Sequence, residues 1–195
     1  MTMHRCIGRL LRPIRAGERR LLTRAVPISS LPESVLIESP AFLNGEAIPL
    51  RYTGLGEEIC PPLRWSNIPP DAQELLLVVE DADAPLPARI THLIVHGIPL
   101  QQGNLEEGSV PNSKGRRLAL QQQRWRLGQN SFGSEAWLGP HPLRGHGTHR
   151  YYFQLFALDT NLIFSKPPNR RQALQAMSGH VLAFGVLVGK CENNG

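Results

Sequence analysis

The chain has 195 residues and a mass of 21.7 kDa, enough for one large domain or two small ones. With 41% hydrophobic and 19% charged residues, the composition excludes a fully disordered chain, and no apolar run approaches the roughly 20 residues of a membrane-spanning helix. Cys6, Cys60 and Cys191 are odd in number and never form a CxxC pair. The sequence therefore predicts neither a disulfide framework nor a thiolate zinc site, in a protein of a reducing compartment.

The positive charge is concentrated at the start of the chain. The formal net charge is +5, but residues 1–24 carry seven arginines and one acid, Glu18, so this segment has +6 and the remainder −1. A nearly neutral body argues against a DNA- or RNA-binding domain. We predict a basic, flexible arm at residues 1–26 and a single domain at 27–195. Three interpretations of the arm stay open: a poorly ordered tail, an arm attracted to phosphate or a membrane surface, and an organelle-import segment on an otherwise cytoplasmic protein.

Proline is so frequent in the first part of the chain that no long helix fits before residue 70, which leaves loops and short strands. Four later segments are short apolar runs rich in β-branched residues and leucine, a pattern typical of buried strands. These strands are predicted at 74–80, 92–98, 150–158 and 183–189. A helix of about two turns is predicted at 170–177, because Asn169 is a suitable N-cap and Gly179 a suitable stop.

The segment 101–133 is polar and has no clear period, so we predict a long surface connection with one strand near 118–125. Strands outnumber helices throughout the chain. The elements together predict a mainly β fold, either an antiparallel β-sandwich or a β-rich α+β domain, to which helices are late additions.

Two loops bring polar residues directly beside predicted apolar strands, where functional residues are often found. The first, 81–85 (DADAP), follows one strand and precedes His92, and the second, 139–151 (GPHPLRGHGTHRY), leads into the aromatic strand. Glycines let a phosphate approach backbone N–H groups, histidine and tyrosine can donate to its oxygens, and paired carboxylates can accept from an ammonium group. These residue types predict a pocket for a small anionic or zwitterionic ligand, against the alternative that both loops are only structural turns.

Two details of the first loop are also predicted. A tight turn directly after a strand favours a cis peptide bond between Ala84 and Pro85. We expect Asp81 to be the most buried of these residues and to orient loop backbone or a histidine instead of touching ligand, so that its replacement costs stability as well as binding.

Metal binding and catalysis have weaker support. His141, His146 and His149 lie within nine residues, but their spacing matches no strong zinc pattern, and His146 is expected to be solvent-exposed on its glycine-rich loop. GxSxG, GxGxxG and P-loop motifs are absent, and no serine or cysteine near the histidines has a motif around it. We therefore expect a protein that is not an enzyme, with no catalytic residue, metal or cofactor.

The segments VEDADAPLP and HLIVHGIP, followed by GPHPLRGHGTHRYYFQLFALD, resemble the two signature regions of the phosphatidylethanolamine-binding protein family, which includes the Raf kinase inhibitor proteins. The resemblance is nearest to the bacterial-type branch of that family. FLNGEAIPLRYTGLGEEICPPLRWSNIP and MSGHVLAFGVLVG are similar to the amino-terminal pattern and the closing helix and strand of this branch. The resemblance covers residues 38–192 and leaves the basic arm outside.

The resemblance implies a Greek-key-like antiparallel β-sandwich, in which a large sheet packs on a smaller one, with one or two short peripheral helices. It also implies a shallow pocket at one end that binds phosphate-like anions and phosphorylethanolamine head groups. The pocket residues that it places on this sequence are Asp81, Asp83, Pro85, His92, Gly139 as a backbone donor, His149 and Tyr151.

The sequence departs from the family pattern at three places. Ala82 stands where the family usually has proline, and Ile90 and Thr91 precede His92 where an aromatic residue is common. His141 begins a run that replaces glycine or cysteine followed by two prolines. We add His141 to the predicted ligand-binding residues, because at the pocket mouth it would add a donor or narrow the entrance.

The function expected from the resemblance is that of a non-enzymatic binding protein for a phosphate or phosphorylethanolamine-type ligand. The alternative is an inhibitor or scaffold of a kinase or serine protease that acts through a protein surface, since members of the family act in that way. The sequence leaves the oligomeric state open.

Overall fold

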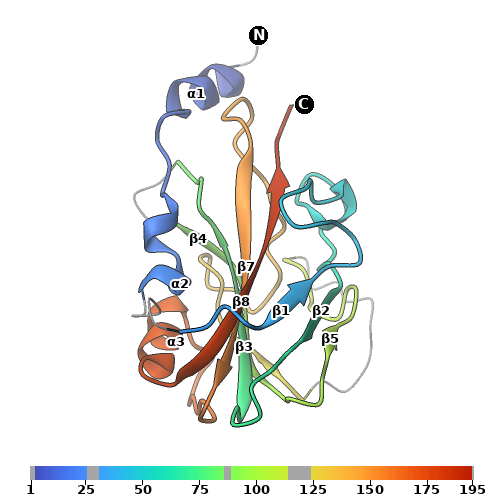
Figure 1. Ribbon diagram of the computed structural model, residues 1–195. Coiled ribbons are helices and arrows are strands. Elements are labelled where there is room, and N and C mark those ends of the chain that lie inside the picture. The colour runs from blue at the N-terminus through green and yellow to red at the C-terminus, as the bar shows by residue number, and fades with distance from the viewer. Residues whose placement is uncertain (1–2, 26–30, 86–88, 114–123, 195) are drawn as a thin grey trace.

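Two antiparallel sheets pack face to face in the computed structural model, which describes residues 3–25, 31–85, 89–113 and 124–194 (Figure 1). The larger sheet has the strand order β6–β4–β3–β7–β8 and the smaller sheet the order β1–β2–β5. The strands of the larger sheet are β3 (Glu74–Asp81), β4 (Ile90–Ile98), β6 (Arg126–Leu127), β7 (His149–Leu158) and β8 (Val181–Cys191). Those of the smaller sheet are β1 (Leu36–Glu38), β2 (Leu63–Ser66) and β5 (Asn104–Leu105). The predicted mainly β sandwich is confirmed.

The four predicted strands are confirmed as β3, β4, β7 and β8, each slightly longer than its apolar run. β3 is buried at every position, because β4 and β7 pair with its two edges and both of its faces are covered. One face, with Leu77 and Val79, meets the smaller sheet, and the other, with Leu76 and Val78, meets helices. The continuous apolar run of β3 follows from this double cover.

Helices cover the second face of the larger sheet. α3 (Arg170–Met177) begins where predicted: the Asn169 side chain accepts the Gln172 N–H and the Gln172 side chain accepts the Asn169 N–H, a capping box. Gly179, with φ of 81°, follows the end of the helix in a conformation that favours glycine. Met177 packs against the sheet together with α2 (Leu22–Ala25), which belongs to the N-terminal arm.

A bulge in β4 decides where His92 lies. Val79 of β3 stands opposite Leu93 of β4, whereas the next residue, Glu80, stands opposite Thr91, so His92 is an extra residue in the ladder. A bulge of this kind turns a side chain away from strict alternation. The ring of His92 therefore meets Tyr151 of β7 edge-on, with ring centroids 5.0 Å apart.

Two predictions about connecting segments were wrong. The segment 101–133 contains β5 and β6 and buries Val110 and Trp125 in the core between the sheets, so it is not only a surface connection. Most of the strand predicted near 118–125 lies outside the described residues. The Ala84–Pro85 peptide bond is trans. The turn is formed instead by the Asp81 carboxylate, whose Oδ1 accepts the N–H of residue 83 at 2.7 Å.

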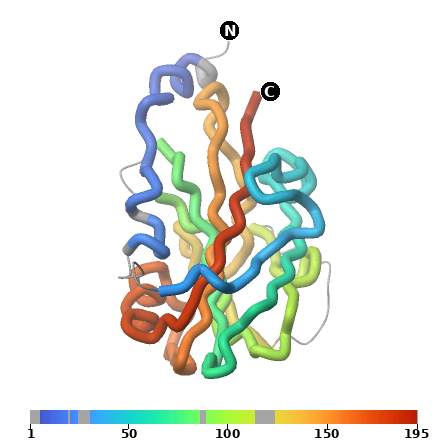
Figure 2. The backbone as a smooth tube through the Cα atoms, viewed as in Figure 1, coloured from blue at the N-terminus to red at the C-terminus, as the bar shows by residue number. Residues whose placement is uncertain are grey.

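The N-terminal arm runs along the larger sheet, from α1 (Met3–Leu11) beside the loop before β7 to α2 at the α3 end of the molecule (Figure 2). A short 3-10 turn, η1 (Glu18–Arg20), lies between them, and η2 (Leu50–Tyr52) is a similar turn in the loop after β1. Leu22 is fully buried against the sheet. We expected a flexible arm at 1–26; its described part, residues 3–25, packs on the domain. Within the described residues, no helix is long and apolar enough to cross a membrane.

Candidate functional site

A cavity of about 610 Å³ opens at the end of the larger sheet where β3 ends and β7 begins. Its lining consists of Asp81, Ile90, His92, Phe132, Leu138, Gly139, His141, Pro142, Leu143, Arg144, Tyr151 and Asn193. Five of the eight predicted ligand-binding residues are in this lining: Asp81, His92, Gly139, His141 and Tyr151. The other three, Asp83, Pro85 and His149, are not.

Asp81 and Tyr151 stand opposite each other on β3 and β7, so their side chains share one face of the sheet. The Tyr151 hydroxyl is buried and makes no hydrogen bond of normal geometry with the described residues. Burial, and then the nearby Asp81 carboxylate, raise the pKa of Tyr151 well above its usual value. The hydroxyl therefore keeps its proton and can donate it to a ligand.

His92 has a defined tautomer. Its Nδ1 lies 2.6 Å from the backbone oxygen of Leu138, and since a carbonyl only accepts, Nδ1 carries the hydrogen. Nε2 is buried and has no hydrogen-bond partner among the described residues. Burial lowers the pKa of His92, although the Asp81 charge opposes this, so the ring is neutral at pH 7. Nε2 then presents a lone pair, and it becomes a donor only when the ring is protonated.

Gly139 was expected to offer its backbone N–H to a phosphate, but this N–H already donates to Glu58 Oε1 at 3.1 Å. The position requires glycine because a Cβ there would lie 2.6 Å from the backbone nitrogen of Gly54. Glu58 is buried, has a left-handed backbone with φ of 60°, and accepts the Ser113 hydroxyl at 2.6 Å. Sequence reasoning missed Glu58, because no motif spacing relates it to the loop that it holds.

Arg144 is the cation of the cavity, and sequence reasoning missed it although it lies within the second loop. Its Nε is buried and has no hydrogen-bond partner among the described residues. His141 is exposed at the same mouth, and the ring of Phe132, which is 71% exposed, completes the apolar rim. The mouth thus combines unpaired donors with apolar surface.

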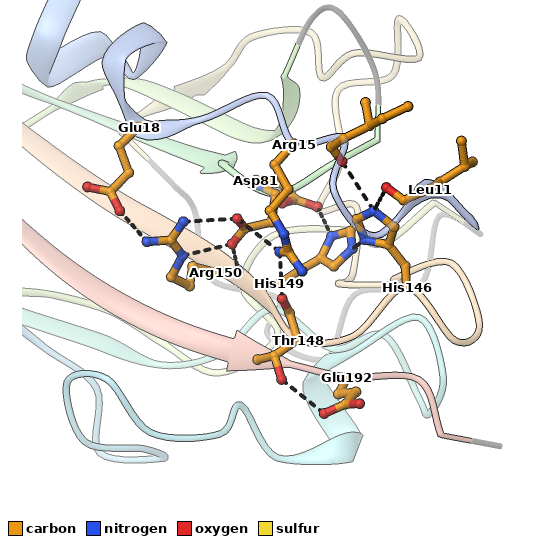
Figure 3. Close-up of polar contacts among 11 residues, drawn as sticks. Leu11, Arg15, Glu18, Asp81, His146, Thr148, His149, Arg150 and Glu192 are labelled. Atoms are coloured by element: carbon orange, nitrogen blue, oxygen red, sulfur yellow. Dashed lines mark hydrogen bonds and ion pairs between the residues drawn. The ribbon is translucent and has the colours of Figure 1, made fainter. Parts of the chain in front are cut away.

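His149 does not line the cavity but contacts Asp81, which does. Its Nδ1 lies 2.8 Å from Asp81 Oδ2 and its Nε2 lies 2.7 Å from His146 Nδ1 (Figure 3). His146 Nε2 in turn lies 2.8 Å from the carbonyl oxygen of Leu11 and 3.2 Å from that of Ile14. His146 was expected to be solvent-exposed; this was wrong, because the arm covers it completely.

The partners fix the protons along this chain. Two carbonyls accept from His146 Nε2, so Nε2 carries a hydrogen; burial lowers the pKa of His146, so the ring is neutral and its Nδ1 accepts from His149. The other ring nitrogen of His149, Nδ1, faces Asp81 Oδ2. The expectation that Asp81 orients a histidine is confirmed, whereas the expectation that it is the most buried of these residues is wrong, since Asp83 and Tyr151 are less exposed.

Asp83 binds the N-terminal arm and does not line the cavity. Arg150 binds both of its carboxylate oxygens, at 2.8 and 2.9 Å, and Arg15 of the arm lies 3.0 Å from Oδ1. Burial alone would raise the pKa of Asp83, but the hydrogen bonds from Arg150 and Arg15 outweigh it and the pKa is lowered. Arg150 also pairs with Glu18 of the arm. Pro85 lies at the outer end of the same turn, half-buried.

No group of three or more histidine, cysteine, aspartate or glutamate side chains is arranged to hold a metal ion in the described part of the chain.

Buried histidines make stability depend on pH. His96 of β4 packs edge-on against Phe164, and burial, followed by the nearby charge of Arg126, lowers its pKa from 6.5 to about 4. Between these values the unfolded chain binds a proton that the folded chain does not, so the free energy of unfolding falls as the pH falls from 6.5 toward 4. Integration over this window gives about 3 kcal/mol for this one group.

Replacing His96 with glutamine should remove this contribution. We expect urea denaturation over a pH series to show that the free energy of unfolding depends less on pH for His96→Gln than for the wild type. Some pH dependence should remain in the variant, because it keeps the two other buried histidines with lowered pKa values, His92 and His146. Equal slopes for the two proteins between pH 6.5 and 4 would contradict the assignment.

Comparisons with known proteins agree with this geometry. Residues 38–192 match the family model described as "Phosphatidylethanolamine-binding protein". A UPF0098 protein of Pyrococcus abyssi is 37% identical over 164 residues, covering 82% of this chain and 86% of the relative. A UPF0098 protein of Methanothermobacter thermautotrophicus is 39% identical over 153 residues, covering 78% of this chain and 95% of the relative.

Two solved structures are similar to this one. One is described as a putative phosphatidylethanolamine-binding protein homologue from Chlamydia trachomatis; it has a TM-score of 0.71 at 32% identity, covering 83% of this chain and 99% of that chain. The other is E. coli YbcL, described as a new member of the mammalian family, with a TM-score of 0.72 at 23% identity, covering 82% of this chain and 98% of that chain. The second likeness shows the shared fold.

Proposed function

The chain belongs to the phosphatidylethanolamine-binding protein family, and from this premise we propose that its cavity binds a small phosphate-bearing ligand of the phosphorylethanolamine type without changing it chemically. The observation that carries the proposal is the set of unpaired polar groups in the cavity. Arg144 Nε and the Tyr151 hydroxyl are buried donors without normal partners in the described chain, and the Asp81 carboxylate lies beside the hydroxyl. Donors and an acceptor in one mostly apolar cavity match a zwitterion.

Charge assigns the two ends of such a ligand. The guanidinium of Arg144 and the hydroxyl of Tyr151 would donate to phosphate oxygens, and charge-assisted hydrogen bonds of this kind are the stronger ones. Each Asp81 oxygen accepts one hydrogen bond within the protein, from His149 and from the N–H of residue 83, and so keeps a lone pair for an ammonium group. A volume of about 610 Å³ is in the usual range for small-molecule sites.

Binding of a phosphate at His92 requires one additional proton. Its Nε2 has a lone pair, and a phosphate oxygen repels that lone pair unless one proton lies between them. Either the ring gains a proton or the phosphate brings one. Binding at neutral pH should therefore take up a proton from solvent when a dianionic phosphate contacts Nε2.

The lining favours binding over catalysis. Among its described residues there is no serine, threonine, cysteine or lysine to act as a nucleophile beside a base. His92 is held through Nδ1 by a backbone carbonyl, and its Nε2 contacts no side chain among the described residues that it could activate. These features support a binding protein.

The test is a calorimetric titration with phosphorylethanolamine and, for comparison, inorganic phosphate. We expect Arg144→Gln to weaken both ligands by about tenfold or more, the usual cost of losing a hydrogen bond to a charged group. Tyr151→Phe should weaken both to a smaller extent. Arg64→Gln is the matched control, because Arg64 lies exposed on β2 and outside the cavity lining, and it should bind both ligands as the wild type does.

Equal affinities for Arg144→Gln, Tyr151→Phe and the wild type would place binding elsewhere and contradict the proposed site. A folded wild-type protein that gives no heat with either ligand, in two buffers of different ionisation enthalpy, would contradict the proposed function.

A further inference from the structure

The inner face of α1 is occupied by the domain. A Cβ on Gly8 would lie 2.0 Å from the backbone oxygen of Arg144, so the helix approaches this loop as closely as glycine allows. Arg12 donates from Nε to the Gly145 carbonyl at 2.9 Å, and the carbonyl oxygen of Leu11, at the end of the helix, contacts His146. One side of α1 is thereby fixed on the loop before β7.

The outer face of α1 is apolar and uncovered by the described residues. Ile7 and Leu10 are three residues apart and therefore lie on the same side of the helix. Leu10 is 78% exposed and Ile7 is 42% exposed, and Ile14, just after the helix, is 48% exposed. Exposed apolar side chains that gather on one helix face mark an interaction surface.

The charge around this face is strongly positive. Residues 1–17, which contain α1, carry four arginines and no acidic residue. Arg9, which directly precedes Leu10, and Arg12, whose Nε is bound to the Gly145 carbonyl, are both exposed. An apolar helix face with arginines at its border is complementary to the surface of an anionic bilayer, where the apolar side chains enter the acyl boundary and the guanidinium groups meet lipid phosphates.

We propose that the apolar surface formed by Ile7 and Leu10 of α1 and by Ile14 just after the helix docks on anionic membrane surfaces and brings the cavity-lining loop before β7 close to them. Arg144 connects the two features, because its backbone contacts Gly8 while its side chain lines the cavity. The docking uses lipid charge and not an ethanolamine head group, so it stands whether or not the cavity binds phosphorylethanolamine.

Vesicle flotation of the full chain tests the proposal. Vesicles of phosphatidylcholine with phosphatidylglycerol are compared with vesicles of phosphatidylcholine alone, at low and high salt. We expect the wild type to bind only the anionic vesicles and to release them at high salt, since added salt screens the attraction. Leu10→Asp should weaken binding at least about tenfold, because it removes a leucine that would enter the bilayer and adds a negative charge that anionic lipids repel.

Ile163→Asp is the matched control. Ile163 is 92% exposed and lies in the loop beyond the opposite end of β7, far along the strand from α1. This variant makes the same change of charge and apolar area, and it should bind anionic vesicles as the wild type does. Both replaced side chains are exposed, so both variants should melt within about 1 °C of the wild type.

Three results would overturn the proposal: no binding of the wild type to anionic vesicles, equal binding to vesicles without phosphatidylglycerol, or equal binding by Leu10→Asp and Ile163→Asp. In each case the apolar face would serve another occupant, such as an import receptor. Titration of Leu10→Asp with phosphorylethanolamine keeps the two proposals separate. The variant should retain the affinity of the wild type, because Leu10 is not part of the cavity lining.

Discussion

Replacing Asp81 with alanine is expected to lower both the free energy of unfolding and the affinity of the cavity for phosphorylethanolamine. Asp81 Oδ2 accepts from the buried ring of His149 at 2.8 Å, and Oδ1 accepts the N–H of residue 83 at 2.7 Å. Alanine leaves both of these partners buried and without their acceptor. We expect a loss of about 3 kcal/mol, measured by urea denaturation at pH 7.

Asp81→Asn removes the negative charge of this side chain and keeps its shape. An asparagine side chain keeps an oxygen that can accept one of the two hydrogen bonds, so its loss of stability should be smaller than that of Asp81→Ala. The negative charge is removed, so calorimetric titration should show weaker binding of phosphorylethanolamine while inorganic phosphate binds as well as before or better. Wild-type stability in Asp81→Ala would contradict the structural role of this carboxylate.

Replacing Leu22 of the arm with alanine should destabilise the whole domain by about 3 kcal/mol. Leu22 is fully buried against Leu76, Val78 and Phe156 of the larger sheet, and its N–H donates to Glu80 Oε2 at 2.9 Å. The alanine leaves a cavity in the core between sheet and helices. Thermal unfolding should therefore show a lower Tm for this variant.

Leu10→Ala is the control, since it makes the same substitution in the same arm at a position that is 78% exposed. We expect its stability to lie within about 0.5 kcal/mol of the wild type. If Leu22→Ala were equally silent, residues 18–25 would leave the sheet in solution and behave as the flexible tail that the sequence predicts.

The sequence predicts those parts of the fold that depend on local pattern. β3, β4, β7 and β8 are apolar runs, and α3 has a capping residue and a glycine stop within its own segment. The arm has no such local signal, because its partners are distant in the chain: Leu22 pairs with Glu80 and Thr23 with Gln154, at 58 and 131 residues' separation. A signal did exist in Glu80 and Gln154, polar residues inside apolar strands, which require buried partners.

The candidate site, too, is predictable only where it depends on local sequence. Chemistry and loop position point to both loops, and the structure brings Asp81, His92 and Tyr151 together in the lining of one cavity. The separate task of Asp83 could not be predicted, because it depends on Arg15 in a segment that carries no motif. Nor could the bulge that turns His92, since strand register depends on pairing across the sheet and not on the spacing within one strand.

The arm is held partly through its backbone. The carbonyls of Leu11 and Ile14 contact His146, and the N–H groups of Ala16, Gly17, Leu22 and Thr23 donate to the domain. Every residue type except proline supplies these groups, so evolution can exchange the outward side chains of the arm without detaching it. The outward side chains of the arm can therefore change without loss of these backbone contacts. The same independence makes the arm a convenient place to install new recognition residues by design.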